Sequence, residues 1–208
     1  MINLIALLIL ILTISIHEFS HALAADKLGD PTPRSFGRLT LNPIAHADPI
    51  GTIFLPLLSA LTGLPTIGWA KPVPIDQFNF RNPKRDIIIT SLAGPLSNFL
   101  FATIVAILAN VFNITNFIIY ITILINISIG IFNLLPIPPL DGSKILFNLL
   151  PEESSLRWQE ALERYGFILL IIMVFLPLGP NGQPIVSSII SPLINLIFRL
   201  LLPSYAGL

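Results

Sequence analysis

The chain has 208 residues, of which 54% are hydrophobic and only 11% are charged, and its mean hydropathy is +0.85. A soluble globular domain carries about 25% charged residues, so this chain lacks the charge to cover a water-facing surface. The 11 basic and 11 acidic residues cancel, which argues against nucleic acid as a partner. The absence of cysteine excludes disulfides and cysteine metal sites. We therefore expect a small integral membrane protein in contact with the lipid bilayer.

Apolar stretches of about 20 residues indicate the membrane spans. Residues 1–25 carry only Glu18 as a charge, and they lack the basic start and cleavage pattern of a signal peptide, so we expect them to remain in the mature protein. Residues 87–140 are uncharged and predict two spans, at 87–112 and 117–135. Residues 165–198 predict two shorter spans, separated by a break at 177–182. The expected fold is an all-α membrane protein, a polytopic helical bundle of about five to six transmembrane segments.

Residues 49–70 are apolar, but proline and glycine interrupt them, so they either cross the membrane or dip into it and return. If they return, all 11 lysines and arginines fall on one side of the membrane, as the positive-inside rule favours. We therefore expect a re-entrant or β-hairpin segment here. The same reasoning predicts a multi-pass protein of the cell membrane with its N-terminus outside and its C-terminus in the cytoplasm.

The pattern divides the chain into three parts. Residues 1–150 form the expected membrane core, which includes a loop at 29–48 with short strands. Residues 151–164 predict a cytoplasmic amphipathic connector, because acidic and basic residues pair at i,i+4 spacing along a short helix. Residues 165–208 predict a C-terminal transmembrane hairpin.

Ionisable residues within an apolar span are costly and tend to mark function. His17, Glu18 and His21 form an H-E-x-x-H pattern near the cytoplasmic end of the first span. Residues four apart share a helix face, so both imidazoles can reach one metal ion, and Glu18 can take a proton from water at that ion. A catalytic zinc has three protein ligands and one open position, so the pattern requires a third ligand.

Two residues are candidates for the third ligand. Asp141 follows the span at 117–135, on the same side of the membrane as His21, and is the carboxylate at the end of the long uncharged run. His46 lies in the loop at 29–48. Carboxylate and imidazole are both normal zinc ligands. We expect Asp141 to be the ligand, with His46 as the alternative.

Three motifs resemble those of the site-2 protease family of intramembrane zinc metalloproteases (peptidase family M50). The first is the H-E-x-x-H pattern itself, within an apolar helix. The second is Ala-Gly-Pro-Leu-Ser-Asn at 93–98, and the third is the stretch from Asn133 to Gly142, which ends in Leu-Asp-Gly. The order of the three motifs also matches the family. Residues 68–74 resemble a membrane-dipping hairpin of some members.

The resemblance implies cleavage of a transmembrane segment of another membrane protein, near the cytoplasmic side. It implies one zinc ion per chain, held by His17, His21 and Asp141, with Glu18 as the catalytic base. It further implies that Asn133 binds substrate or stabilises the reaction and that Asn98 assists in the core. We expect a minimal form of the family, without a PDZ or nucleotide-binding CBS domain.

The sequence also suggests roles for two loop residues and leaves two alternative functions open. His46 and Asp48 are candidates for bracing the loop near the metal. The alternatives to a protease are a membrane metal transporter that uses the same ligands and an inactive homologue that binds helices without cutting them.

Overall fold

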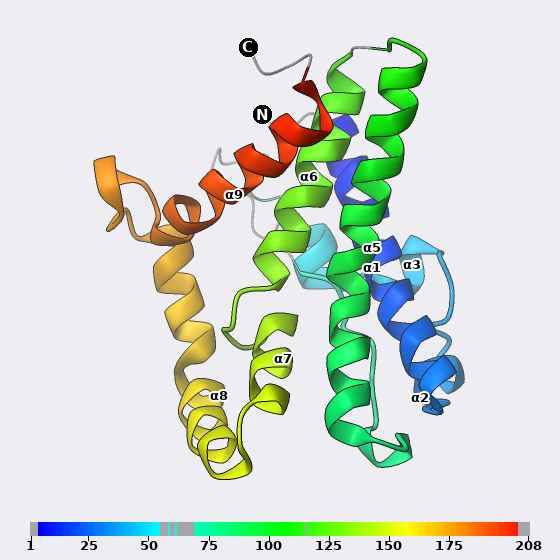
Figure 1. Ribbon diagram of the computed structural model, residues 1–208, viewed down its shortest axis with the longest axis vertical. Coiled ribbons are helices and arrows are strands. Elements are labelled where there is room, and N and C mark those ends of the chain that lie inside the picture. The colour runs from blue at the N-terminus through cyan, green and yellow to red at the C-terminus, as the bar shows by residue number, and fades with distance from the viewer. Residues whose placement is uncertain (1–3, 55–57, 59–60, 62–68, 115, 204–208) are drawn as a thin grey trace.

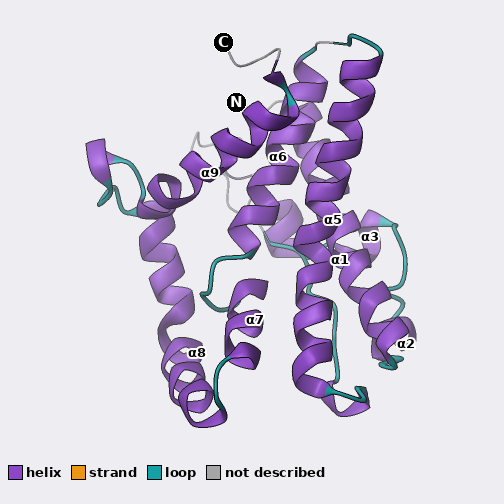
Figure 2. Cartoon of the chain, viewed as in Figure 1, coloured by secondary structure: helices purple, strands orange, loops and turns teal. Residues whose placement is uncertain are grey.

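The computed structural model describes residues 4–54, 58, 61, 69–114 and 116–203. These residues form helices joined by loops, with no strand among them (Figure 2). The longer helices are α1 (Leu4–Leu28), α5 (Pro83–Val111), α6 (Phe117–Asn133), α8 (Glu152–Phe175) and α9 (Ile185–Leu201). The shorter ones are α2 (Thr32–Ser35), α3 (Pro43–His46), the π-helix η1 (Pro49–Phe54), the 3-10 turns η2 (Gln77–Asn79) and η3 (Pro180–Gly182), and α7 (Asp141–Leu149). Helices α2 and α3 thus occupy the loop in which short strands were expected.

Helix α5 packs against both α1 and α6 in the centre of the molecule (Figure 1). The burial pattern of α1 is opposite to that of a helix in a soluble protein. It buries the polar side chains of Thr13 and His17 and exposes the apolar side chains of Leu8 and Leu12. Exposed apolar faces of this kind suit contact with lipid rather than water. By length and composition, α1 and α5 are long and apolar enough to cross a membrane. The all-helical structure is therefore consistent with a helical membrane protein.

A polar contact joins the three central helices. Asn98 of α5 donates from its amide to Asn126 Oδ1 of α6 at 3.3 Å, and Asn126 donates to Thr13 Oγ1 of α1 at 3.0 Å. All three side chains are buried. Polar pairs of this kind hold membrane helices together, because an unpaired amide in an apolar interior is costly.

The apolar core joins α5, α6 and α9. Small side chains of α5 let α6 and α9 approach closely, and the cluster consists of Ala102, Ala106, Ala109, Ile123, Ile127, Ile131, Ile194, Phe198 and Leu202. A second cluster, formed by Ile137, Leu140 and Leu170, fastens the loop between α6 and α7 to α8. The two clusters fix both ends of α6, and hence the place where α7 begins.

The predicted spans at 87–112 and 117–135 correspond to α5 and α6, and a turn through Asn113, with φ +52°, separates them. The C-terminal part differs from expectation. A surface helix at 151–164 was expected to precede a span, but α8 continues from residue 152 to residue 175 without a break. The physical reason is that no proline stands at the boundary, and the one nearby glycine, Gly166, is tolerated within the helix because it packs against Pro138.

The end of α9 lies beside the end of α5. Asn110 of α5 donates to the carbonyl of Leu201 at 3.1 Å, and Figure 1 shows the start of α1 at this same end of the molecule. Two full crossings by α8 and α9 would instead bring residue 201 to the opposite end. The lengths explain this difference, because α9 measures about 26 Å and the uncharged half of α8 about 16 Å, whereas a crossing needs about 30 Å.

The described ends of the ambiguous segment at 49–70 lie next to each other. Trp69 donates its backbone N–H to the Gly51 carbonyl at 3.2 Å, and Thr52 Oγ1 donates to the Trp69 carbonyl at 2.8 Å. Residues 55–57, 59–60 and 62–68, on which most of the expected re-entrant segment falls, lie outside the described residues. From residue 69 the chain continues in extended conformation to η2 and then enters α5.

Candidate metal centre

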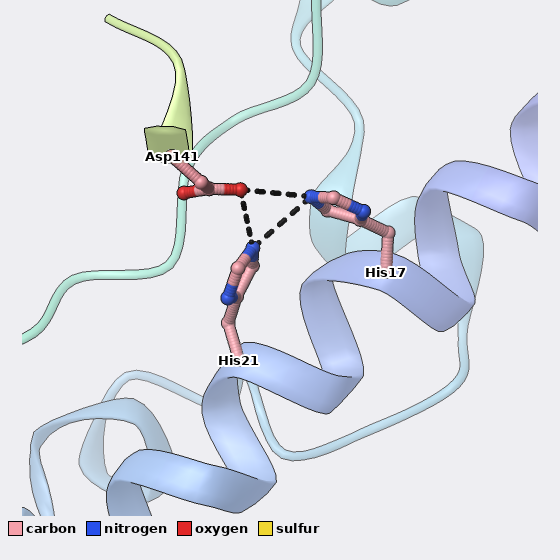
Figure 3. Close-up of side chains that lie close together, drawn as sticks. All are labelled: His17, His21 and Asp141. Atoms are coloured by element: carbon pink, nitrogen blue, oxygen red, sulfur yellow. Dashed lines mark hydrogen bonds and ion pairs between the residues drawn. The ribbon is translucent and has the colours of Figure 1, made fainter. Parts of the chain in front are cut away.

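His17, His21 and Asp141 lie together in the interior of the protein (Figure 3). Asp141 Oδ2 lies 3.2 Å from His17 Nε2 and 2.9 Å from His21 Nε2, and the two Nε2 atoms are 3.0 Å apart. The three residues are between 4% and 6% exposed. The structure thus joins Asp141, and not His46, to the two histidines of α1. Two imidazoles and a carboxylate form a donor set that binds zinc.

A hydrogen bond to the second ring nitrogen orients each histidine. His17 donates from Nδ1 to Asn98 Oδ1 at 2.6 Å, and His21 donates from Nδ1 to the Thr90 carbonyl at 2.6 Å. Both acceptors lie on α5, so the packing of α1 on α5 sets both rings. Partners of this kind fix the tautomer of a metal-binding histidine and direct the lone pair of the other nitrogen toward the metal.

The three groups fit a bound cation. Because both Nδ1 atoms donate, the neutral rings present lone pairs at Nε2, and these converge with the carboxylate on one point. Such convergence is unfavourable without a cation among the donors. Gly94 of α5 provides the space: a Cβ at this position would lie 2.3 Å from His21 Nε2 and 2.6 Å from His17 Nε2. The glycine therefore leaves room where a metal ion would lie.

Asp141 reaches the histidines because the chain breaks after α6. Prolines at 136, 138 and 139 end the helix, and α7 starts at Asp141 itself. Gly142 allows this turn to approach α6, since a Cβ there would lie 2.2 Å from the Leu134 carbonyl oxygen. The other carboxylate oxygen of Asp141, Oδ1, accepts a hydrogen bond from Lys144 Nζ at 3.1 Å.

Glu18 is half-buried and contacts the extended segment that precedes α5. Its Oε2 accepts a hydrogen bond from the backbone N–H of Val73 at 3.2 Å. Val73, Thr90 and Lys144 all line a cleft of about 1110 Å³. Each of these three residues is also bonded to a different member of the site, namely Glu18, His21 and Asp141. The cleft therefore adjoins the metal centre.

His46 and Asp48 lie outside the cluster. His46 is buried, donates from Nε2 to the Thr40 carbonyl at 2.8 Å and accepts at its own carbonyl from the Lys71 N–H at 2.9 Å. Asp48 accepts from the N–H groups of Ile50 and Gly51 and thereby caps η1. The backbone of His46 thus anchors the extended segment two residues before its contact with Glu18.

Asn98 and Asn133 have different surroundings. Asn98 is fully buried and contacts His17 directly. Asn133 ends α6 and donates from its amide to the Ile129 carbonyl of its own helix at 3.0 Å. The recorded contacts of Asn133, among the described residues, do not include the histidines or Asp141.

Sequence reasoning missed several contributors to the site. Lys144 appeared only as one of the basic residues, although its spacing of three from Asp141 was visible. Asn126 could have been found as an amide in an uncharged span that needs a partner. Thr90 and Val73 act through backbone atoms, which carry no signal in the sequence. Gly94 stood out only as part of the motif at 93–98, because its position against the histidines depends on how α5 crosses α1.

Comparison with known proteins agrees with this geometry. The model of peptidase family M50 matches residues 5–117 and 109–173. The chain belongs to peptidase family M50. This confirms the resemblance to the site-2 protease family and the expectation of a metalloprotease. No solved structure matches the chain.

Relatives of this M50 peptidase come from several bacteria. It is 35% identical over 198 residues to YwhC of Bacillus subtilis, named as a zinc metalloprotease, and the match covers 89% of this chain and 84% of YwhC. It is 29% identical to Rip2 of Mycolicibacterium smegmatis and 28% identical to Rip2 of Mycobacterium tuberculosis, both named in the same way. Each Rip2 match covers 80% of this chain and 65% of Rip2.

Proposed function

We propose that this M50 peptidase is an intramembrane zinc endopeptidase that cleaves transmembrane segments of other membrane proteins. The observation that carries the proposal is the convergence of His17, His21 and Asp141 inside an apolar bundle. Glu18 directly follows His17 in the chain. The zinc metalloprotease names of YwhC and Rip2 support zinc as the metal. The proposal assigns one ion per chain to this cluster.

In this proposal the three ligands hold zinc, which when bound supplies a Lewis acid that acidifies water and polarises a carbonyl. Glu18 accepts the proton of the attacking water and passes it to the leaving amine. The Val73 N–H orients the Glu18 carboxylate for this transfer. Asn98 and the Thr90 carbonyl keep both imidazoles in the tautomer that leaves Nε2 unprotonated.

Asn133 is proposed to bind the substrate. Its contact with the Ile129 carbonyl uses one of its two amide protons, so the other can donate to a substrate carbonyl near the metal. Such a donor stabilises the charge that develops on the carbonyl oxygen during attack. In this role Asn133 contacts the substrate and does not contact the metal ligands.

The cleft is proposed to admit both water and an unwound stretch of substrate. It has apolar walls at Phe78, Phe147 and Phe167, and its polar residues include Lys84 and Lys144. A transmembrane helix hides its carbonyls in its own hydrogen bonds, so the stretch to be cut must first leave the helix. Apolar walls suit side chains that come from a membrane segment.

The cleft is proposed to face the cytoplasm. It opens between the starts of α5 and α8, at the end of the bundle where the basic residues at 27–38, 71–85 and 144–164 lie. The paired ends at Gly51 and Trp69 support a segment that dips into the membrane and returns. The contact of Asn110 with Leu201 supports a revised topology, in which α8 and α9 together make one crossing and the C-terminus lies outside.

The test is Glu18→Gln in protein reconstituted into liposomes with a panel of single-span reporter proteins. We expect reporter cleavage by the wild type to fall by at least about 10²-fold in the variant, because the general base is lost. Zinc content should stay at one ion per chain, whereas His17→Ala should lose both zinc and cleavage. Zinc uptake into the same liposomes by both wild type and Glu18→Gln, without reporter cleavage, would instead support a transporter.

A further inference from the structure

Lys144 lies at the junction of the metal centre and the cleft, and the reaction as described above gives it no part. We propose that Lys144 is a positioning residue that keeps Asp141 a one-oxygen metal ligand. The proposal rests on the proposed zinc site.

The two oxygens of Asp141 have separate partners. Oδ2 faces both Nε2 atoms, at 3.2 Å and 2.9 Å, whereas Oδ1 accepts from Lys144 Nζ at 3.1 Å. The Asp141 side chain is only 8% exposed, so this contact joins a cation to a carboxylate that water hardly reaches. A charge-assisted hydrogen bond of this kind is stronger than a neutral one.

A carboxylate at this position has a competing use. Asp141 is the first residue of α7, and acidic side chains at the start of a helix commonly interact with its unpaired N–H groups. Within the described part of the chain, no backbone N–H is recorded as a donor to the Asp141 carboxylate. Lys144, one turn further along α7, binds Oδ1 on the side of the cleft and so holds the carboxylate away from its own helix end.

The arrangement matters for the number of ligands. Two imidazoles and one carboxylate oxygen give three protein ligands, which leaves one position open on a four-coordinate zinc. If Oδ1 also turned toward the metal, the carboxylate would take two positions. The contact with Lys144 keeps Oδ1 occupied, so that with one bound water the ion would have four ligands rather than five.

The test compares Lys144→Met with Lys144→Arg, which retains a cation able to reach Oδ1. Lys84→Met is the matched control for the number of metal ligands, because Lys84 lines the same cleft but has no recorded ion pair among the residues that the structure describes. Zinc X-ray absorption and the visible spectrum of cobalt-loaded protein report the number of metal ligands without any substrate. Reporter cleavage then gives kcat and KM.

We expect four ligands in the wild type, in Lys144→Arg and in Lys84→Met, and five in Lys144→Met. The kcat of Lys144→Met should fall about tenfold or more, with KM little changed, because changes around metal ligands typically cost 10- to 100-fold. An unchanged ligand number and kcat in Lys144→Met would overturn the inference. If Lys144→Met does not fold, Lys144→Ala, which also removes the donor to Oδ1, serves in its place with the same expected outcome.

The failure of this inference differs from a failure of the proposed function. A wild type without zinc or without reporter cleavage would overturn both. A wild type that binds zinc and cleaves the reporter, beside a Lys144→Met variant that behaves identically, would overturn only the role of Lys144.

Discussion

At the scale of single residues, the metal centre depends on side chains and backbone atoms that come from three helices. α1 supplies both histidines, α7 supplies Asp141, and α5 supplies the acceptors for both Nδ1 atoms. Spacing along α1 predicts that the imidazoles share a face, and their ring centroids lie 4.6 Å apart. The orientation of each ring, in contrast, depends on contacts 69 and 81 residues away in the chain.

Gly94 gives the sharpest prediction at this scale. We expect Gly94→Ala to lose most of its zinc, because the new methyl group would lie within 2.6 Å of both Nε2 atoms, in the space where a metal would bind. Metal analysis of the purified protein, performed beside the wild type, measures this loss. Ser97→Ala is the control, since among the described residues the recorded hydrogen bond of the Ser97 hydroxyl goes to the Gly94 carbonyl of its own helix. A Gly94→Ala protein that retains one zinc per chain would contradict the assigned position of the metal.

At the scale of elements, the segment before α5 is held by a buried carboxylate in the loop after α1. Asp30 is fully buried and accepts hydrogen bonds from the N–H of Thr32, the N–H of Asp76 and the amide of Asn79. These contacts join the end of α1 to η2 and so help to place the extended segment that contacts Glu18. The segment before α5, which has no strong sequence pattern of its own, is thus positioned by the Asp30 side chain.

This contact predicts a pH dependence of stability. Burial raises the pKa of the Asp30 carboxyl, but hydrogen bonds from Thr32, Asp76 and Asn79 lower it by more, so the pKa lies below its ordinary value. The ionised carboxylate therefore stabilises the fold above the unfolded-state pKa, about 3.9, and this stabilisation is lost as the pH falls through the lowered folded-state pKa.

Thermal unfolding at pH 7 and at pH 3 tests the role of Asp30. We expect Asp30→Asn to destabilise the protein by about 1–3 kcal/mol at pH 7, because an amide cannot accept all three hydrogen bonds. The variant should also lose less stability than the wild type on acidification. Asp26→Asn, which removes an ion pair with the exposed Arg34, should have a smaller effect at pH 7. Equal acid sensitivity in Asp30→Asn and wild type would contradict this explanation.

At the scale of the whole molecule, the arrangement of the helices decides which ends share a side of the membrane. The Asn110–Leu201 contact brings the end of α9 to the turn between α5 and α6. Five crossings would have brought it to the opposite side. In the proposed topology, the end of α9 lies outside the cell, on the side of the bundle opposite to the cleft.

Labelling of single cysteines tests this topology directly, because the chain has no cysteine of its own. We expect Ile114→Cys and Pro203→Cys, both at exposed positions, to react with a membrane-impermeant maleimide added to intact cells. Glu160→Cys, on the exposed surface of α8, should react only after the membrane is opened. If Pro203→Cys reacts only after the membrane is opened, as Glu160→Cys does, the result would support a cytoplasmic C-terminus instead.

The sequence by itself determined the apolar helices, the H-E-x-x-H face and the break that precedes Asp141, because each depends on neighbours within a few residues. Helix periodicity places His17 beside His21, and proline ends a helix wherever it removes a hydrogen-bond donor. Only the tertiary structure decided which side chain completes the cluster, that Gly94 clears its space, and that the end of α9 lies beside the end of α5. Those features arise where residues far apart in the chain pack together, and packing geometry is a property of the whole bundle rather than of any one segment.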